Sequence, residues 1–226
     1  MSAPADELPI QRRATPAYRL LRAVLTPLLR LIFRFEVSGR EQIPGDGPYV
    51  MIANHLNWLD NFAILLAFPA EPRIHFLADP ELLRRRRLQW WVVRKTAGYI
   101  AVDVHKEVDL EMRRRVLECL RLGAVVAVYP EGRYGTREGE LQPFKKGFAH
   151  FALQAGEVPV LPVALSGTKD LWLGKRVRVA IGSPITASGD VDELVHVARH
   201  RMERLLPPYA ERAGLKPLRR FLTGLF

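Results

Sequence analysis

The sequence predicts one α/β domain in which a mixed, largely parallel sheet is flanked by helices and preceded by an amphipathic helical segment. Short apolar runs rich in β-forming residues alternate with apolar or amphipathic segments of helical length, as expected for such a fold. The 226 residues are 48% hydrophobic, which is enough for one sizeable core. Cys119 is the single cysteine, so an intrachain disulfide is excluded, and its place in a helical apolar pattern favours a core residue.

We expect four segments: a disordered N-terminus at 1–14, amphipathic membrane-associating helices at 15–35, the α/β domain at 36–212, and a basic amphipathic tail at 213–226. Thr15-Pro16 is a helix-start signal, and Pro27 should kink or split the helical segment that follows. Its arginines lie on one stripe and its leucines cover most of the remainder. This pattern fits an interfacial membrane helix or a core-packing helix with a solvated arginine face.

The elements of the domain follow from apolar runs and their punctuation by glycine, proline and capping residues. Prolines inside the sixth strand favour an edge or bulged position for it. Asp79-Pro80 opens one helix. The strands are expected at 36–38, 49–53, 73–78, 98–102, 124–129, 158–165 and 177–181, and further helices at 58–68, 109–122, 147–155 and 190–212.

The stretch Asn54 to Asp60 follows the buried strand 49–53 and precedes a helix, the position where ligands bind in α/β sheets. A helix that begins near Asn57 places Asp60 in its first turn, where its carboxylate can face the His55 imidazole. Such a carboxylate fixes the tautomer and leaves the other ring nitrogen as a general base for a hydroxyl group. The alternative is structural, with Asn57 as the helix cap, Asp60 satisfying free N–H groups and His55 a buried histidine.

A second group of polar residues follows the apolar strand 124–129. Gly132 lets the backbone approach a ligand closely, and Arg133 and Arg137 carry fork-shaped donors suited to phosphate. Lys145 and Lys146 stand at the start of the next helix. A salt-bridged loop is the alternative interpretation.

The formal net charge of +10 favours an anionic partner: an acidic membrane surface, a phosphorylated molecule, an acidic protein or nucleic acid. Nucleic acid is the least favoured of these, because no zinc-finger spacing or RNA-binding aromatic signature occurs. No uncharged apolar run reaches the length of a membrane span, and no secretory signal pattern is present. The arginine run 84–87 before Trp90-Trp91 is either a solvated face or a contact with lipid headgroups.

Four blocks occur in order along the chain: Asn54-His55-x4-Asp60, Gly98 to Val102, Pro130-Glu131-Gly132 and Val158 to Val163. Together they resemble the glycerolipid acyltransferases, and among these most the 1-acyl-sn-glycerol-3-phosphate acyltransferases. The similarity extends from about Val37 to Ile185. The family usually has Thr then Arg after Glu-Gly, whereas Arg133 and Tyr134 stand there in a longer loop, so either Arg133 or Arg137 is the phosphate-binding arginine.

The resemblance implies that His55 is the general base and that Asp60 orients it. The acceptor hydroxyl would attack the thioester of acyl-CoA or acyl-carrier protein directly, with no acyl-enzyme, no metal and no cofactor. The resemblance makes 1-acylglycerol-3-phosphate the expected acceptor, giving phosphatidic acid; another lysolipid such as lyso-ornithine lipid, or non-catalytic lipid binding, is the alternative. The expected location is the cytoplasmic face of the cell membrane, as a peripheral protein. The expected substrate-binding residues are Asn57, Glu131, Gly132, Arg133, Arg137, Lys145 and Lys146.

Overall fold

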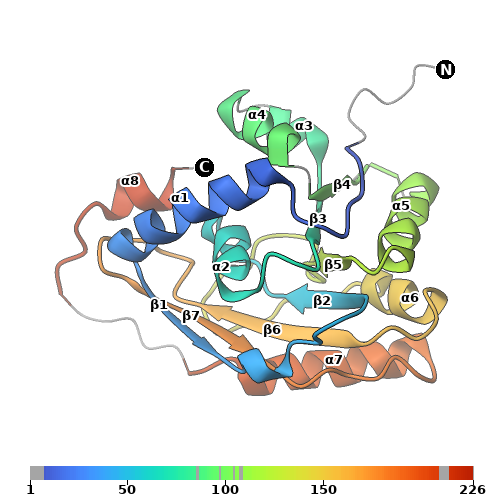
Figure 1. Cartoon of the computed structure of the whole chain (residues 1–226). Helices are drawn as coiled ribbons and strands as arrows, with labels where there is room; N and C mark the ends of the chain where they lie inside the picture. The colour runs from blue at the N-terminus through green and yellow to red at the C-terminus, as the bar shows by residue number, and fades with distance from the viewer. Residues whose placement is uncertain are drawn as a thin grey trace.

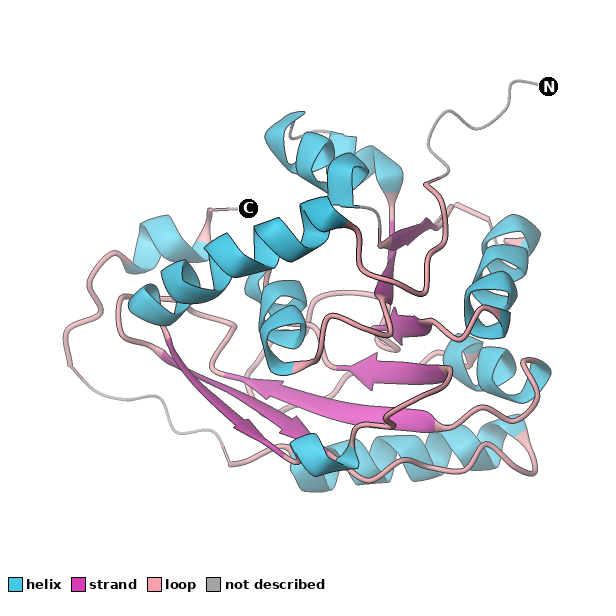
Figure 2. Ribbon diagram, in the orientation of Figure 1, coloured by secondary structure: helices cyan, strands magenta, loops and turns pink. Residues whose placement is uncertain are grey.

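The computed structural model describes residues 8–84, 87–96, 98–103, 105–106, 109–208 and 214–225. A seven-stranded sheet in the order β1-β7-β6-β2-β5-β3-β4 forms the centre of the molecule. Helices α1 and α2 lie on one face of this sheet, and α5, α6 and α7 lie on the other (Figure 1). Figure 2 shows the same alternation of helix and strand that the sequence pattern predicts. The mixed α/β fold is therefore confirmed.

Most neighbouring strands run parallel, and the exception is the antiparallel pair of β6 and β7. β1 pairs with β7 in parallel, so these two strands run against the other five. The central strand β2 is buried at every residue, and its alternating side chains therefore enter two different cores. The strands are β1 (Arg34–Ser38), β2 (Tyr49–Ala53), β3 (Ile74–Ala78), β4 (Tyr99–Ala101), β5 (Val125–Val128), β6 (Val160–Ser166) and β7 (Arg176–Ile181).

The helices begin where the sequence places capping residues. Thr15, Asp109 and Asp190 each accept a hydrogen bond from a backbone N–H of the first turn of α1, α5 or α7. A short 3-10 helix (Arg40–Gln42) follows β1. The α-helices are α1 (Pro16–Ile32), α2 (Leu59–Ala67), α3 (Pro80–Arg84), α4 (Arg87–Thr96), α5 (Leu110–Arg121), α6 (Gly147–Gln154), α7 (Val191–Leu205) and α8 (Arg219–Thr223).

Two apolar cores hold the layers together. On one face of β2, Tyr49 and Met51 pack with residues of α1 and α2. On the other face, Val50 and Ile52 pack with residues of α5, α6 and α7. Cys119 belongs to the second core and is fully buried, as its helical pattern predicted, and burial raises the pKa of its thiol.

The sequence predicted an edge or a bulged position for the sixth strand, and the edge position is wrong. β6 lies inside the sheet between β7 and β2. Pro162 stands just before the regular pairing with β7, which begins at Val163 and Ile181, and its carbonyl accepts a hydrogen bond from Gly182 N. Its missing N–H thus falls at an irregular point of the ladder.

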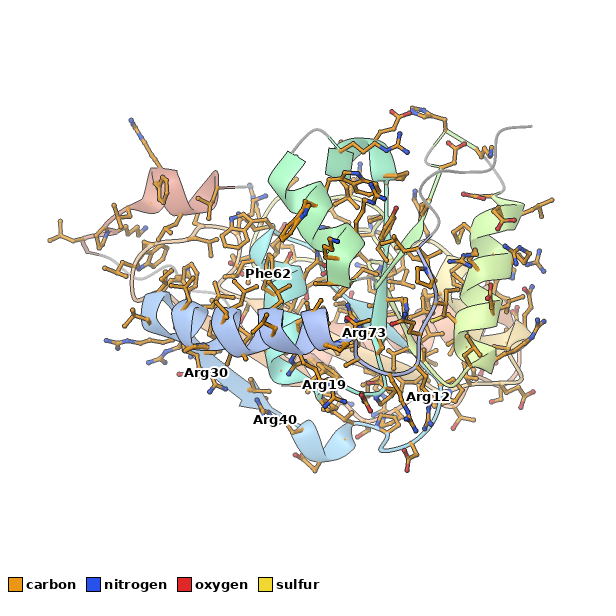
Figure 3. All side chains as sticks on the ribbon, turned by 45° about the horizontal axis from the view of Figure 1, so that its top comes forward. Arg12, Arg19, Arg30, Arg40, Phe62 and Arg73 are labelled. Atoms are coloured by element: carbon orange, nitrogen blue, oxygen red, sulfur yellow. The ribbon has the colours of Figure 1, made fainter. Side chains whose placement is uncertain are left out.

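The N-terminal helical segment is one continuous helix, α1, rather than a split pair, with Pro27 on its exposed side. It is fixed to the domain through its polar residues. The Arg73 guanidinium lies 3.4 Å from the centre of the Tyr18 ring, and Arg22 donates to the carbonyl of Phe68. Arg19 pairs with Glu71 at 2.5 Å. Figure 3 shows Arg19 and Arg73 near the N-terminal end of α1 and Arg30 towards its other end.

Residues at the two ends differ from expectation where the structure describes them. Arg73 N donates to Arg12 O, and Ala14 N donates to Glu71, so 8–14 lie against the domain instead of being disordered. The last long helix ends at Leu205 rather than Arg212. Residues 1–7 and 209–213 lie outside the described residues. Among the helices that the structure describes, none is long and apolar enough to cross a bilayer.

Candidate active site

The carboxyl ends of three adjacent parallel strands bring the predicted polar residues to one edge of the sheet. His55 follows β2, Glu131 follows β5, and the loop that carries Lys169 follows β6. β2 lies between the other two strands. This is the edge where α/β sheets bind ligands, and two of its three loops were predicted as functional from the sequence.

The His55 imidazole and the Asp60 carboxylate form the centre of the site. His55 Nδ1 lies 2.8 Å from Asp60 Oδ2, and the His55 side chain is 16% exposed while that of Asp60 is fully buried. A carboxylate at Nδ1 favours the tautomer with hydrogen on that nitrogen, which leaves Nε2 as the acceptor. The predicted pair is therefore present with the geometry that a general base requires.

The same carboxylate oxygen also accepts hydrogen bonds from the backbone N–H groups just before α2. Asp60 Oδ2 accepts hydrogen bonds from Leu56 N at 2.5 Å and Asn57 N at 2.8 Å. The helix begins at Leu59, two residues later than expected, and Asn57 bonds Trp58 N from outside it. The predicted structural role of Asp60 and its predicted contact with His55 are therefore both present, because one oxygen contacts the imidazole and accepts the backbone N–H groups that follow it.

Two tyrosine rings enclose the imidazole. The Tyr129 ring stacks on one face of His55 with centroids 3.9 Å apart and planes 9° apart. The Tyr134 ring lies 4.2 Å from the imidazole at 36°. Tyr129 is held by a hydrogen bond from its hydroxyl to Asn61 Oδ1, and burial raises its pKa well above the usual value. Neither tyrosine was predicted from the sequence, because the sequence around them does not reveal that their rings lie against His55.

The loop after β5 holds the backbone of His55 on both sides. His55 N donates to Glu131 Oε1, and Gly135 N donates to His55 O at 2.6 Å. The other Glu131 oxygen accepts from Gln142 N at 2.7 Å. Burial raises the pKa of Glu131, while these N–H donors act in the opposite direction. The Glu131 carboxylate thus ties the backbone of His55 to the loop after β5, with both of its oxygens engaged by backbone N–H groups.

The loop after β6 supports the site from the other side. Asn57 Nδ2 donates to Lys169 O at 3.0 Å, and Lys169 Nζ donates to Gly135 O at 2.6 Å. Glu138 accepts N–H bonds from Gly167 and Lys169 and so joins the two loops. Asn57 is therefore occupied in positioning the backbone. Glu138 and Lys169 were missed, since only the fold brings their loops together.

The basic residues predicted to bind substrate have different surroundings in the structure. Gly132 has φ +65°, and a β-carbon there would lie 2.7 Å from Lys145 Cε, so the Lys145 chain lies directly against this glycine. Arg133 is exposed and lies 3.5 Å from Gln142 Oε1. Arg137 is paired with Glu140, and Lys146 with Asp192 of α7. Among the described residues, Lys145 and Arg133 are therefore the two of these cations that form no ion pair.

Comparison with known proteins gives the family. A family model described as "Acyltransferase" matches residues 34–166. The human "1-acyl-sn-glycerol-3-phosphate acyltransferase alpha" is 30% identical over 209 residues, which are 85% of this chain and 71% of that protein. The chain belongs to the acyltransferase family. The resemblance found in the four sequence blocks is thereby confirmed, and the protein is an O-acyltransferase.

Two more comparisons extend over most of this acyltransferase. The "1-acyl-sn-glycerol-3-phosphate acyltransferase" of Bacillus subtilis is 28% identical over 178 residues, which are 74% of this chain and 82% of that protein. The crystal structure of the 1-acyl-sn-glycerophosphate acyltransferase PlsC from Thermotoga maritima aligns with a TM-score of 0.66 at 22% identity, covering 87% of this chain and 81% of that one. At this identity the structure establishes the fold alone.

Proposed function

We propose that the protein transfers a fatty acyl group from acyl-CoA or acyl-carrier protein to the free hydroxyl of 1-acylglycerol-3-phosphate, giving phosphatidic acid. The observation that carries the proposal is the His55 Nδ1–Asp60 Oδ2 contact of 2.8 Å, which leaves Nε2 free to accept a proton. The choice of 1-acylglycerol-3-phosphate as the acceptor is supported by the names of this protein's relatives in mammals and in Bacillus subtilis.

In the proposed reaction, Nε2 of His55 accepts the hydroxyl proton while the hydroxyl oxygen attacks the thioester carbonyl. A new ester C–O bond forms and the C–S bond breaks. The departing thiolate takes the proton from the imidazolium, which restores the neutral base. A thioester is already activated, so a positioned hydroxyl and a base suffice, and we propose that no cofactor takes part.

We propose that the acceptor phosphate binds beside Gly132, with Lys145 as its main cation and Arg133 assisting. Within the described ranges, the Lys145 ammonium forms no hydrogen bond or ion pair, whereas its neighbour Lys146 is paired with Asp192 at 2.6 Å. The matched variants are therefore Lys145→Ala and Lys146→Ala. The first should raise KM for the acceptor about tenfold or more, and the second should change it less than about twofold.

An acceptor panel tests the substrate. Thiol release and ester product are measured with acyl-CoA and with acyl-carrier protein, using 1-acylglycerol-3-phosphate, lyso-ornithine lipid and lysophosphatidylcholine. Preference for the first acceptor, lost in Lys145→Ala, supports the proposal. Preference for lyso-ornithine lipid would change the acceptor while retaining the reaction. Absence of transfer to all three would overturn the proposal and favour the lipid-binding alternative.

We further propose that α1 seats the enzyme on the cytoplasmic face of the cell membrane as a peripheral protein. Because Arg19 and Arg22 are bound to the domain, the helix presents apolar side chains outward. Leu20, Val24, Leu28 and Leu31 are between 48% and 81% exposed. Side chains at this spacing form one face of a helix, as in helices that lie in a bilayer interface.

The C-terminal segment extends the same surface. Gly174 N donates to Ile32 O at the end of α1, and Leu173 N donates to Pro217 O, so this loop links α1 to the segment before α8. α8 lies near the C-terminal half of α1 (Figure 1). Leu218 and Phe221 are exposed there beside basic residues such as Arg220, which suits anionic lipid headgroups.

Vesicle sedimentation tests the membrane surface. Val24→Glu with Leu31→Glu should lower binding to anionic phospholipid vesicles about tenfold or more. The matched control is Leu110→Glu, which replaces a leucine that is equally exposed but lies on α5, across the sheet from α1. Equal binding by the double variant and the control would contradict a role for α1.

A further inference from the structure

The loop that holds the His55 backbone also covers its side chain. Glu131 Oε1 accepts from His55 N, and Gly135 N donates to His55 O, so the residues between them are fixed over this histidine. Tyr134 lies between these two anchors, and its ring centroid is 4.2 Å from that of the imidazole. The Tyr129 ring centroid lies 3.9 Å from the same imidazole, and because two rings this close would overlap on one face, the two tyrosines take opposite faces.

The two rings differ in how they are held. Tyr129 is fixed by its hydroxyl hydrogen bond to Asn61 at 2.6 Å and by the core around it. Tyr134 is 56% exposed, although its ring contacts the imidazole. One face of the base is therefore covered by the rigid interior, and the other is covered by a surface side chain on the loop that also carries Arg133.

We propose that Tyr134 is a positioning residue that closes the outer face of the His55 imidazole, so that only the Nε2 edge is open to a hydroxyl group. The proposal rests on the proposed role of His55 as the base. An acceptor anchored at its phosphate can reach this edge in the plane of the ring. With Tyr134 over the outer face, water can approach Nε2 only along this same edge, which a bound acceptor fills.

The two aromatic rings also stabilise the protonated form of His55. When Nε2 takes the acceptor proton, the imidazolium lies between two aromatic faces, and a cation over an aromatic face is attracted by the ring. Its Nδ1–H remains bonded to Asp60. Tyr134 thus acts through His55 on the chemical step, by its ring rather than by its hydroxyl.

Tyr134→Ala and Tyr134→Phe form the matched pair of variants. Tyr134→Ala should lower kcat about 3- to 30-fold with KM for the acceptor changed less than about twofold, while Tyr134→Phe should stay within about twofold of wild type. Thiol release from acyl-CoA without any acceptor should rise relative to transfer in Tyr134→Ala, because water gains access to the base.

A third measurement does not depend on the identity of the acceptor. Diethyl pyrocarbonate modifies neutral imidazole, and peptide mass spectrometry follows its reaction at His55. Modification should be faster in Tyr134→Ala than in wild type and unchanged in Tyr134→Phe. Equal rates in all three proteins, with unchanged kcat and unchanged hydrolysis in Tyr134→Ala, would overturn the proposal. A loss in Tyr134→Phe as large as in Tyr134→Ala would also overturn it, because the hydroxyl would then be the active group.

Discussion

Asp60→Asn should reduce catalysis only moderately. Oδ2 of Asp60 accepts the bonds from His55 Nδ1, Leu56 N and Asn57 N, whereas Oδ1 is buried and has no hydrogen-bond partner among the described residues. An asparagine can therefore place its oxygen where Oδ2 stands and its amide nitrogen where Oδ1 stands. The tautomer of His55 and the start of α2 are then retained, and the negative charge alone is lost.

The magnitude follows from the interaction of that charge with the imidazolium. At roughly 4 Å between charge centres and an effective dielectric constant of about 20, the attraction is about 4 kcal/mol. With the proton about half transferred in the transition state, about 2 kcal/mol of stabilisation is lost, which corresponds to about a 30-fold lower kcat. Asp60→Ala removes the acceptor altogether, so kcat should fall by about 10²- to 10⁴-fold and the fold should weaken as well.

The assay is thiol release from acyl-CoA at saturating acceptor for wild type, Asp60→Asn, Asp60→Ala and His55→Ala. Far-ultraviolet circular dichroism and thermal melting confirm that each variant is folded. The order of activity should be wild type, Asp60→Asn, then the two alanine variants. Asp60→Asn as inactive as His55→Ala, in a folded protein, would refute the reasoning, because the second carboxylate oxygen would then be needed to orient the base.

Three further predictions concern stability, each measured by urea unfolding. Glu131→Gln should lower the free energy of unfolding by about 1–3 kcal/mol, since one amide oxygen cannot replace two carboxylate oxygens that each accept an N–H bond. An unchanged free energy of unfolding would show that these two hydrogen bonds do not stabilise the fold. Burial lowers the pKa of His75 from 6.5 to about 4, so the unfolded chain takes up its proton first as the pH falls. Wild type should then lose about 3 kcal/mol more than His75→Gln between pH 7 and pH 4, and equal losses would be inconsistent with a neutral buried histidine. Tyr18→Leu should cost about 1–3 kcal/mol by removing the ring beneath Arg73, and wild-type stability would show that this contact does not fix α1.

The parts of this molecule that follow from local sequence were predicted well. The alternation of apolar runs predicted the α/β class, and the helices predicted to start at Thr15, Asp109 and Asp190 begin one residue after each, where these residues act as caps. The His55–Asp60 contact was also accessible, because both residues belong to one turn and the geometry between them is local.

The misplaced features depend on contacts between distant segments. The prolines of the sixth strand indicated an edge, yet the neighbours of β6 come from residues 12 to 18 positions onward and more than 100 positions back. The arginines of α1 suggested a headgroup-facing stripe, but Glu71 and the carbonyl of Phe68 bind two of them. The Tyr134 ring lies against a histidine that precedes it by 79 positions, which no local pattern reveals.

The central claim is that the Nε2 edge of His55 removes the proton from the acceptor hydroxyl. The most direct test compares wild type with His55→Ala for the formation of diacyl product from 1-acylglycerol-3-phosphate and acyl-CoA, with circular dichroism and vesicle binding as controls for fold and membrane association. We predict that product formation falls by about 10²-fold or more while both controls remain unchanged. Product formation by His55→Ala at the wild-type rate would contradict the account.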